Sequence, residues 1–130
     1  MRVLLDTHIA LWSVKGSPKL SREAVRLIVS ADGVFFSSIS LVEIAVKHAR
    51  GPASPDPILV DARQAHAEFR LAGFTELALT AAHAEALDTL PPLHRDPFDR
   101  MLIAQAMTEP MRLLTHDAAM TAYGALVAAV

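Results

Sequence analysis

The sequence predicts an α/β fold in which a parallel sheet is covered by helices on both faces. Two observations lead to this prediction. Short apolar segments alternate with longer stretches of helical periodicity, which is typical of parallel strands joined by right-handed crossovers. The chain has 130 residues, a usual size for one domain with its own core. We therefore expect a single domain over residues 1–130.

The first third of the chain contains two predicted strands and three predicted helices. Residues 3–5 form a short apolar run, and residues 9–14 continue as a helix until a Gly-Ser-Pro turn. A second helix is expected to begin after Ser21, because serine caps helix N-termini well. The Val-Phe-Phe segment at 34–36 suits a buried strand, and residues 40–48 have helical periodicity.

The middle of the chain is expected to leave the sheet and return to it. Three prolines within residues 51–57 indicate a surface loop. Residues 59–71 then form an amphipathic helix, and residues 74–79 are a candidate strand. Thr80 is a candidate cap for a helix that ends before Pro91.

The last third of the chain has the same alternation. Asp96 is a candidate N-cap, and Pro97 suits the first position of a helix that continues to residue 107. The remaining predicted elements are a strand over 111–114, a short helix over 118–123 and an edge strand over 125–130. Together these segments predict a central sheet of four to five strands.

The composition excludes several classes of protein. The absence of cysteine excludes disulfides and thiolate zinc sites. Hydrophobic residues make up 52% of the chain, yet no stretch reaches the roughly 20 apolar residues of a membrane span. Asp6 comes too early for the apolar segment of a secretory signal, so we expect a soluble, cytoplasmic protein. Because the net charge is −2, any contact with nucleic acid must be local or assisted by a metal.

Four acids are expected to meet at one edge of the sheet. Asp6 directly follows the first strand, and Asp117 lies three residues after Leu114 in a later strand. Glu43 and Asp99 are each expected in the first turn of a helix that leads away from that edge. Ligands of parallel α/β sheets bind at the carboxyl ends of the strands. The four carboxylates are therefore candidate functional groups.

Helix capping is an alternative explanation for each acid taken alone. Ser40 and Glu43 match the capping box, in which both side chains satisfy exposed backbone donors. Asp99 would lie beside the positive end of a helix dipole. Asp6 and Asp117 could each cap the helix that follows them. Capping does not, however, predict that four acids converge on one edge of one sheet.

Converging carboxylates require a compensating cation, because they repel one another and raise each other's pKa. Hard oxygen ligands favour Mg²⁺, with Mn²⁺ as a substitute. Such a metal activates water and stabilises the departing oxygen during attack on a phosphodiester. The six histidines have no paired zinc spacing. His94 and His116 are candidate general bases, although we interpret them first as loop residues beside charges.

Four short motifs together resemble those of PIN-domain proteins. The motifs are Leu4–Ile9, Ser37–Ile44, His94–Ala106 and Leu114–Asp117. More narrowly, they are similar to the VapC toxins of bacterial toxin–antitoxin operons, in the same order and spacing over essentially the whole chain. The resemblance implies a three-layer α/β/α fold and magnesium-dependent endonucleolytic cleavage of RNA. It also implies inhibition by a cognate VapB-like antitoxin, and a homodimer that can join a higher assembly with it.

The resemblance assigns roles to individual residues. Asp6, Glu43 and Asp117 match the first, second and fourth acids of the family. We place the third at Asp99, because its spacing to the following helix matches the family better, and Asp96 is the alternative. The implied catalytic and metal-binding residues are thus Asp6, Glu43, Asp99 and Asp117, with Thr7 and Thr115 beside them to orient waters or ligands.

Two other functions are kept as alternatives. A catalytically inactive PIN-fold module that binds RNA or acts as a scaffold would have the same fold, although the presence of all four acids argues against it. A receiver-type phosphoacceptor would share the sheet architecture, but it would have adjacent acids early and a lysine late.

Three large side chains near these motifs have structural interpretations. We expect Arg95 and Arg100 to pair with neighbouring acids rather than with phosphate. We expect Trp12 to lie in the core or at a dimer interface rather than to stack on a base.

Overall fold

The computed structural model describes all 130 residues as five strands with helices between them. The strands are β1 (Arg2–Leu5), β2 (Gly33–Ser37), β3 (Thr75–Leu77), β4 (Arg112–Thr115) and β5 (Val127–Ala129). The helices are α1 (Thr7–Lys15), α2 (Arg22–Ser30), α3 (Ser38–Ala49), α4 (Ala62–Leu71), α5 (Ala81–Ala86) and α6 (Pro97–Thr108), with the 3₁₀ helices η1 (Leu87–Thr89) and η2 (Ala118–Tyr123). The predicted α/β fold is confirmed, and the sheet has the upper number of strands expected.

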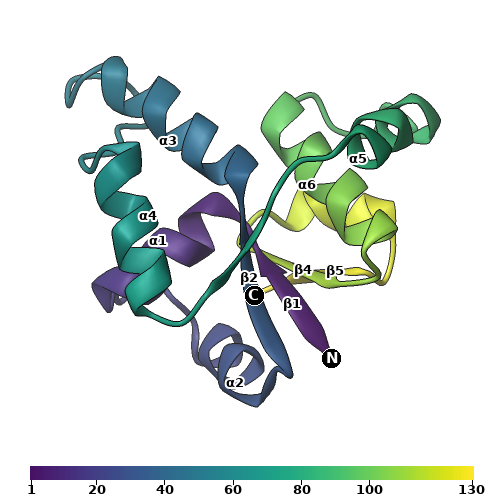
Figure 1. Cartoon of the computed structure of the whole chain (residues 1–130), viewed down its shortest axis with the longest axis horizontal. Coiled ribbons are helices and arrows are strands. Elements are labelled where there is room, and N and C mark those ends of the chain that lie inside the picture. The colour runs from purple at the N-terminus through teal and green to yellow at the C-terminus, as the bar shows by residue number, and fades with distance from the viewer.

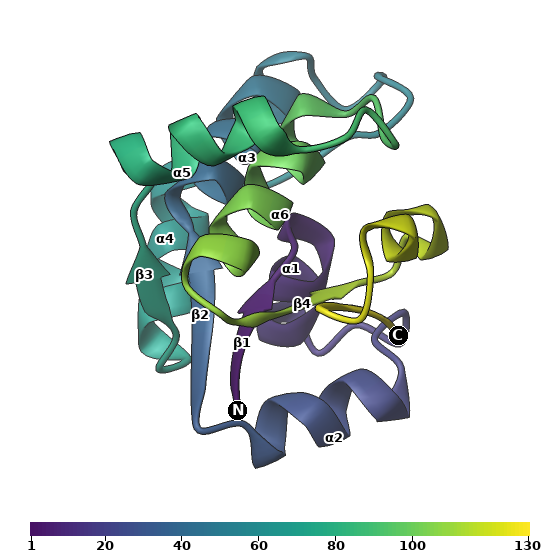
Figure 2. The ribbon, with the colours of Figure 1, turned by 90° about the vertical axis from the view of Figure 1, so that its right-hand side faces the viewer.

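The five strands form one parallel sheet in the order β3-β2-β1-β4-β5. Figure 2 shows β3, β2, β1 and β4 side by side in this order. After β1, the chain adds β2 and β3 on one side of it and then β4 and β5 on the other side. This order creates a topological switch point between β1 and β4. A receiver-type sheet has the order 2-1-3-4-5, so the receiver alternative is wrong.

Helices cover both faces of the sheet and enclose two cores. Figure 1 shows α1 and α4 on one side of the sheet and α5 and α6 on the other. In β1, Val3 and Leu5 pack into the first core with Phe36 and Phe69, whereas Leu4 packs into the second core. Alternate residues of a strand point to opposite faces, so a continuous apolar strand serves both cores. The three-layer arrangement expected from the sequence is confirmed.

Side-chain caps define where most helices begin. Ser21, Thr80 and Asp96 cap α2, α5 and α6 as predicted, each accepting a backbone N–H in the first turn. The helix expected from residue 59 begins only at Ala62, because Asp61 accepts from the backbone N–H of Gln64 and caps it. Local hydrogen bonds therefore set these boundaries more sharply than hydrophobic periodicity does.

The capping box considered as an alternative explanation for Ser40 and Glu43 is wrong. The N-cap is Ser37, whose hydroxyl accepts from the N–H of Ile39, so α3 begins directly at the end of β2. Ser40 and Glu43 consequently lie inside the helix, and Glu43 is in its second turn rather than its first. Capping thus offers no explanation for Glu43. None of the helices combines the length and the apolar character that crossing a membrane requires.

Candidate active site at the carboxyl edge of the sheet

A pocket of about 330 Å³ lies at the carboxyl edge of the sheet, beside the switch point between β1 and β4. Ligand sites of open α/β sheets form there because the connecting loops part in opposite directions. Its lining residues are Asp6, Thr7, His8, Glu43, Lys47, Asp56, Asp96, Asp99, His116, Asp117 and Ala118. We call this space the carboxylate pocket. It brings together all four acids and Thr7, as well as the alternative acid Asp96.

Asp6 is held rigidly at the end of β1. Its Oδ1 accepts the backbone N–H of Ile9 at 2.9 Å, which caps α1, and its Oδ2 accepts the hydroxyl of Thr115 at 2.5 Å. Leu5 pairs with Leu114 in the sheet, so Thr115 at the end of β4 is placed opposite Asp6. Asp6 therefore both caps a helix and lines the pocket, and only 4% of its surface is exposed to solvent.

Glu43 reaches the same pocket from α3. Its Oε1 accepts the hydroxyl of Thr7 at 2.7 Å, and Oε2 pairs with Lys47 Nζ at 2.8 Å, one helical turn further on. Lys47 also lies 2.6 Å from Asp56 Oδ2, in the loop before α4. Burial works against the charge of Lys47, but its bonds to Asp56 and Glu43 raise its pKa overall. Glu43 is thus held by a hydroxyl on one side and an ammonium group on the other.

Asp99 and Asp117 meet through a shared histidine. His94 Nε2 lies 2.8 Å from Asp99 Oδ2 and 3.5 Å from Asp117 Oδ2. Asp117 also caps η2 by accepting the backbone N–H of Ala119. One ligand atom from each of His94, Asp99 and Asp117 lies within 4.8 Å of the other two. Ligands on opposite sides of Mg²⁺ are about 4 Å apart, given bonds of roughly 2.0–2.1 Å. The carboxylates of Asp99 and Asp117 can therefore share a cation after small movements, whereas the imidazole of His94 is not a ligand type that Mg²⁺ prefers.

Asp99 is the acid with the most perturbed ionisation. Its pKa is raised from 3.8 to about 6. Burial is the main cause, the charges of Asp96, Asp6 and Glu43 add to it, and the hydrogen bond from His94 acts in the opposite direction. The influence of these three charges shows that Asp99 lies near the other acids of the pocket. A buried carboxylate that resists ionisation gains most from a nearby cation.

Asp96 is committed to its helix. Its Oδ1 accepts the N–H groups of Phe98 and Asp99 at 2.8 and 3.3 Å, so one oxygen is used for capping α6. Asp96 still lines the carboxylate pocket. Both Asp96 and Asp99 line the pocket, so the choice of Asp99 as the third acid stays a prediction.

His116 lies at the edge of the carboxylate pocket. Its Nδ1 is 3.7 Å from Asp6 Oδ2, and the Asp6 carboxylate raises the pKa of the imidazole, with smaller contributions from Asp117 and Asp99. Both His94 and His116 thus lie beside carboxylates, as expected for loop histidines near charges.

Two functional candidates, Lys47 and Asp56, were missed from the sequence. Lys47 could have been found, because it follows Glu43 by four residues on the same helix face. His94 was named as a candidate base and as a loop residue beside charges, but its position between two particular acids was not predicted. Asp56 lies in a proline-rich loop, and no local pattern connects it with α3.

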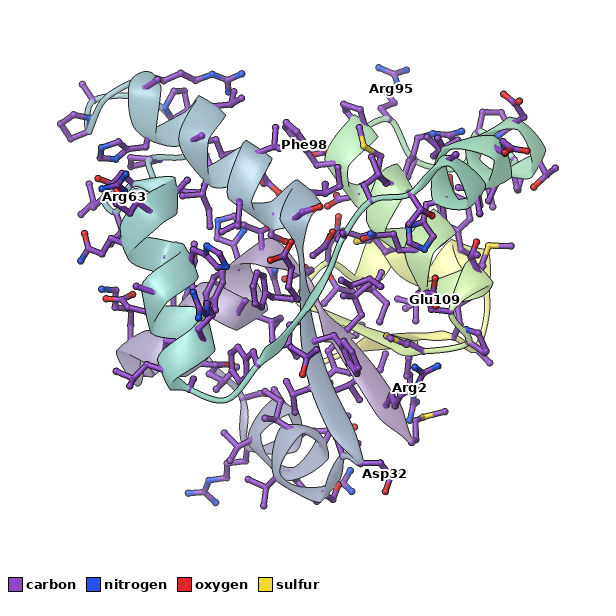
Figure 3. All side chains as sticks on the ribbon, viewed as in Figure 1. Arg2, Asp32, Arg63, Arg95, Phe98 and Glu109 are labelled. Carbon is purple, nitrogen blue, oxygen red and sulfur yellow. The ribbon has the colours of Figure 1, made fainter.

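The interpretation of the two arginines needs correction, whereas Trp12 packs against the first core, as one of the two expected positions. Arg95 is exposed and has no acidic partner, and Figure 3 shows it pointing outward near the start of α6. Arg100 bonds to the carbonyl of Pro91 and the hydroxyl of Tyr123 rather than to an acid. Trp12 is only half-buried, so it contacts the first core without being enclosed by it.

Comparisons with known proteins identify relatives over nearly the whole chain. The model of the PIN domain family matches residues 3–126. Ribonuclease VapC22 of Mycobacterium tuberculosis is 34% identical over 116 residues, which cover 88% of this chain and 86% of the relative.

Solved structures share the fold at low sequence identity. A structure of VapBC2 from Rickettsia felis, bound to a DNA fragment from its promoter, has a TM-score of 0.67 at 15% identity, over 95% of this chain and 93% of the other. VapC20 of Mycobacterium tuberculosis, a toxin that cleaves the sarcin–ricin loop, has a TM-score of 0.60 at 19% identity, over 98% of both chains. The family model and the 34% identity together decide the family: this chain is a PIN-domain protein of the VapC type.

Proposed function

We propose that this protein is a metal-dependent endoribonuclease and the toxin of a VapBC-type toxin–antitoxin pair. The observation that carries the proposal is the convergence of Asp6, Glu43, Asp99 and Asp117 on one pocket from four separate parts of the chain. The similarity to Ribonuclease VapC22 supports RNA as the substrate. We further propose a VapB-like antitoxin as the partner, because structural relatives include toxin–antitoxin complexes.

The carboxylates fit a hard divalent cation, and we propose Mg²⁺, with Mn²⁺ as a substitute. Asp6 and Asp99 would hold the metal, and Glu43 and Asp117 would complete the site. When bound, the cation supplies positive charge that activates water and lets an acidic pocket accept an anionic phosphodiester.

The protein's own groups prepare the carboxylates for this function. Thr115 and the N–H of Ile9 fix both oxygens of Asp6, so that little rotation has to be lost on binding. Thr7 does the same for one oxygen of Glu43. Lys47 is the only lysine or arginine that lines the pocket, and it offsets part of the negative charge. His94 holds Asp99 and Asp117 together.

The test compares RNA cleavage by the purified protein with cleavage by the Asp6→Asn, Asp99→Asn double variant, in Mg²⁺ and in EDTA. We expect the wild type to cut RNA only with the metal and the double variant not to cut, while its circular dichroism spectrum is unchanged. Glu85→Gln is the matched control, because Glu85 is an exposed acid on α5 outside the pocket. Cleavage by a correctly folded double variant would refute the carboxylate mechanism. A wild type that binds RNA without cutting it would favour the inactive-module alternative.

A further inference from the structure

A second cavity adjoins the carboxylate pocket and has a different chemical character. Its volume of about 850 Å³ lies within the range of roughly 300–1,000 Å³ that is typical of small-ligand sites. It is formed by α1, the turn after it and the loop before α4. Its apolar lining comes mainly from Leu11, Trp12, Ile58, Leu59 and Val60, and Asp56 is its only acid. We call this space the tryptophan cavity.

Trp12 presents an aromatic surface in this cavity. Its ring is half-buried, and its neighbours are the rings of His116 at 5.0 Å and His8 at 5.8 Å between centroids. The side chain of Lys19 lies over the ring, with Nζ 6.0 Å from the centroid. Lys19 is exposed and makes no ion pair with any acid. It can therefore move aside when a flat ligand approaches.

The two spaces are continuous. His8, Asp56 and His116 line both of them. His116 connects them directly, because its ring contacts Trp12 on one side and its Nδ1 lies 3.7 Å from Asp6 on the other. A ligand with an anionic group at the carboxylate pocket can thus extend into the tryptophan cavity.

The chemistry of the two spaces is complementary to a nucleotide chain. A phosphate with its metal suits the carboxylate pocket, whereas a base requires a flat, apolar and aromatic surface. Lys15 and Lys19 also line the tryptophan cavity; Lys15 is paired with Glu68 at 2.9 Å, which leaves Lys19 available for a neighbouring phosphate.

We propose that the tryptophan cavity binds one unstacked RNA base adjacent to the cleaved phosphodiester, with the base stacked on Trp12. This inference rests on the proposed ribonuclease function and deepens it, because it selects single-stranded or looped RNA over continuous duplex. Bases inside a duplex are already stacked and cannot reach such a surface, whereas loop bases can. Trp12 is then a binding residue for the substrate, contrary to its interpretation from the sequence.

Trp12 is the only tryptophan in the chain, so its fluorescence reports on this cavity alone. The experiment titrates six-nucleotide oligouridylate and oligoadenylate into the Asp6→Asn, Asp99→Asn double variant, which keeps the RNA intact. We expect saturable quenching by both. An abasic ribose-phosphate chain of equal length and charge should quench weakly and bind at least tenfold less tightly. Equal quenching and equal affinity for the abasic chain would overturn the proposal.

Affinity is measured independently by fluorescence anisotropy of labelled RNA. Trp12→Ala in the same double variant should weaken binding about 5- to 150-fold, as expected for the loss of one base–aromatic stack worth about 1–3 kcal/mol. Trp12→Phe should retain part of this affinity and is less disturbing to the core. Lys19→Ala should weaken binding and reduce its salt dependence, whereas Arg70→Ala, at an exposed cation outside both spaces, should not.

The outcomes separate this proposal from the ribonuclease proposal. If the protein is not a nuclease, the wild type does not cut RNA, but quenching still shows whether a base binds at Trp12. If the nuclease proposal is right and the base site is wrong, Trp12→Phe and Lys19→Ala bind and cut RNA like the wild type. If these substitutions leave the RNA affinity unchanged but convert a dimer into a monomer in size-exclusion chromatography, the proposal is overturned. The surface around Trp12 would then be assigned to contact with a second copy of the chain.

Discussion

Replacing Asp99 by asparagine should stabilise the protein while removing its activity. In the absence of metal, burial and neighbouring charges raise the pKa of Asp99 from 3.8 to about 6. The difference corresponds to about 3 kcal/mol, since one pKa unit is about 1.36 kcal/mol. The ionised carboxylate therefore destabilises the folded state by about this amount at pH 8, relative to a neutral group.

Part of the stability that is gained by removing the charge of Asp99 is offset in the variant. The negative charge of Asp99 lies in the first turn of α6, where its interaction with the helix dipole contributes about 0.3–1 kcal/mol. Asparagine keeps an oxygen that can accept the hydrogen bond from His94. We therefore expect Asp99→Asn to raise the free energy of unfolding by about 2 kcal/mol at pH 8, or the melting temperature by roughly 7 °C for a chain of this length.

The destabilising effect of Asp99 depends on pH. Above about pH 6, Asp99 is ionised in both the folded and the unfolded protein, and its full destabilising effect is present. As the pH falls from about 6 towards 3.8, the folded protein takes up the proton first and the effect declines. Below 3.8 the group is neutral in both states, so the wild type and Asp99→Asn should have nearly equal stability.

The assay is urea unfolding at pH 8 and pH 4 in EDTA, with Glu85→Gln as the control that removes an exposed acid. Adding Mg²⁺ should then stabilise the wild type more than Asp99→Asn, because a ligand that binds the folded state more tightly stabilises it more, with the logarithm of its concentration over Kd. A variant that is no more stable than the wild type at pH 8, or whose advantage is the same at pH 4, would refute the account of Asp99 as a strained buried carboxylate.

Two further substitutions test how the fold supports the site. Thr115→Val removes the hydroxyl that orients Asp6 while preserving the shape of the side chain. In metal titrations of cleavage, this variant should bind Mg²⁺ about 10- to 100-fold more weakly. Thr121→Val, which removes an exposed hydroxyl in η2, is the control and should behave like the wild type. Gly16→Ala should lower the free energy of unfolding by about 1–2 kcal/mol, because Gly16 ends α1 at φ +60° with no atom within 4 Å of an added Cβ. Unchanged stability of Gly16→Ala in urea unfolding would show that this left-handed conformation carries no strain.

The sequence predicted the features that depend on neighbouring residues. Strands that are buried on both faces, such as Val3–Leu5, appear as continuous apolar runs in the sequence. Caps such as Ser21 and Asp96 bond to residues only two or three positions away, so they are also visible in the sequence. The edge of the sheet that collects Asp6 and Asp117 was also predictable. Both residues follow the ends of strands, and those strands run parallel.

The tertiary structure decided the features that depend on distant residues. The order β3-β2-β1-β4-β5 results from which strand pairs with β1, and hydrophobic patterns do not encode it. The placement of His94 between Asp99 and Asp117, and of Asp56 on Lys47, requires packed loops from different parts of the chain. Glu43 shows the same limit: Ser37 and Ser40 are both good local caps, and only the end of β2 at Ser37 decides which one begins α3.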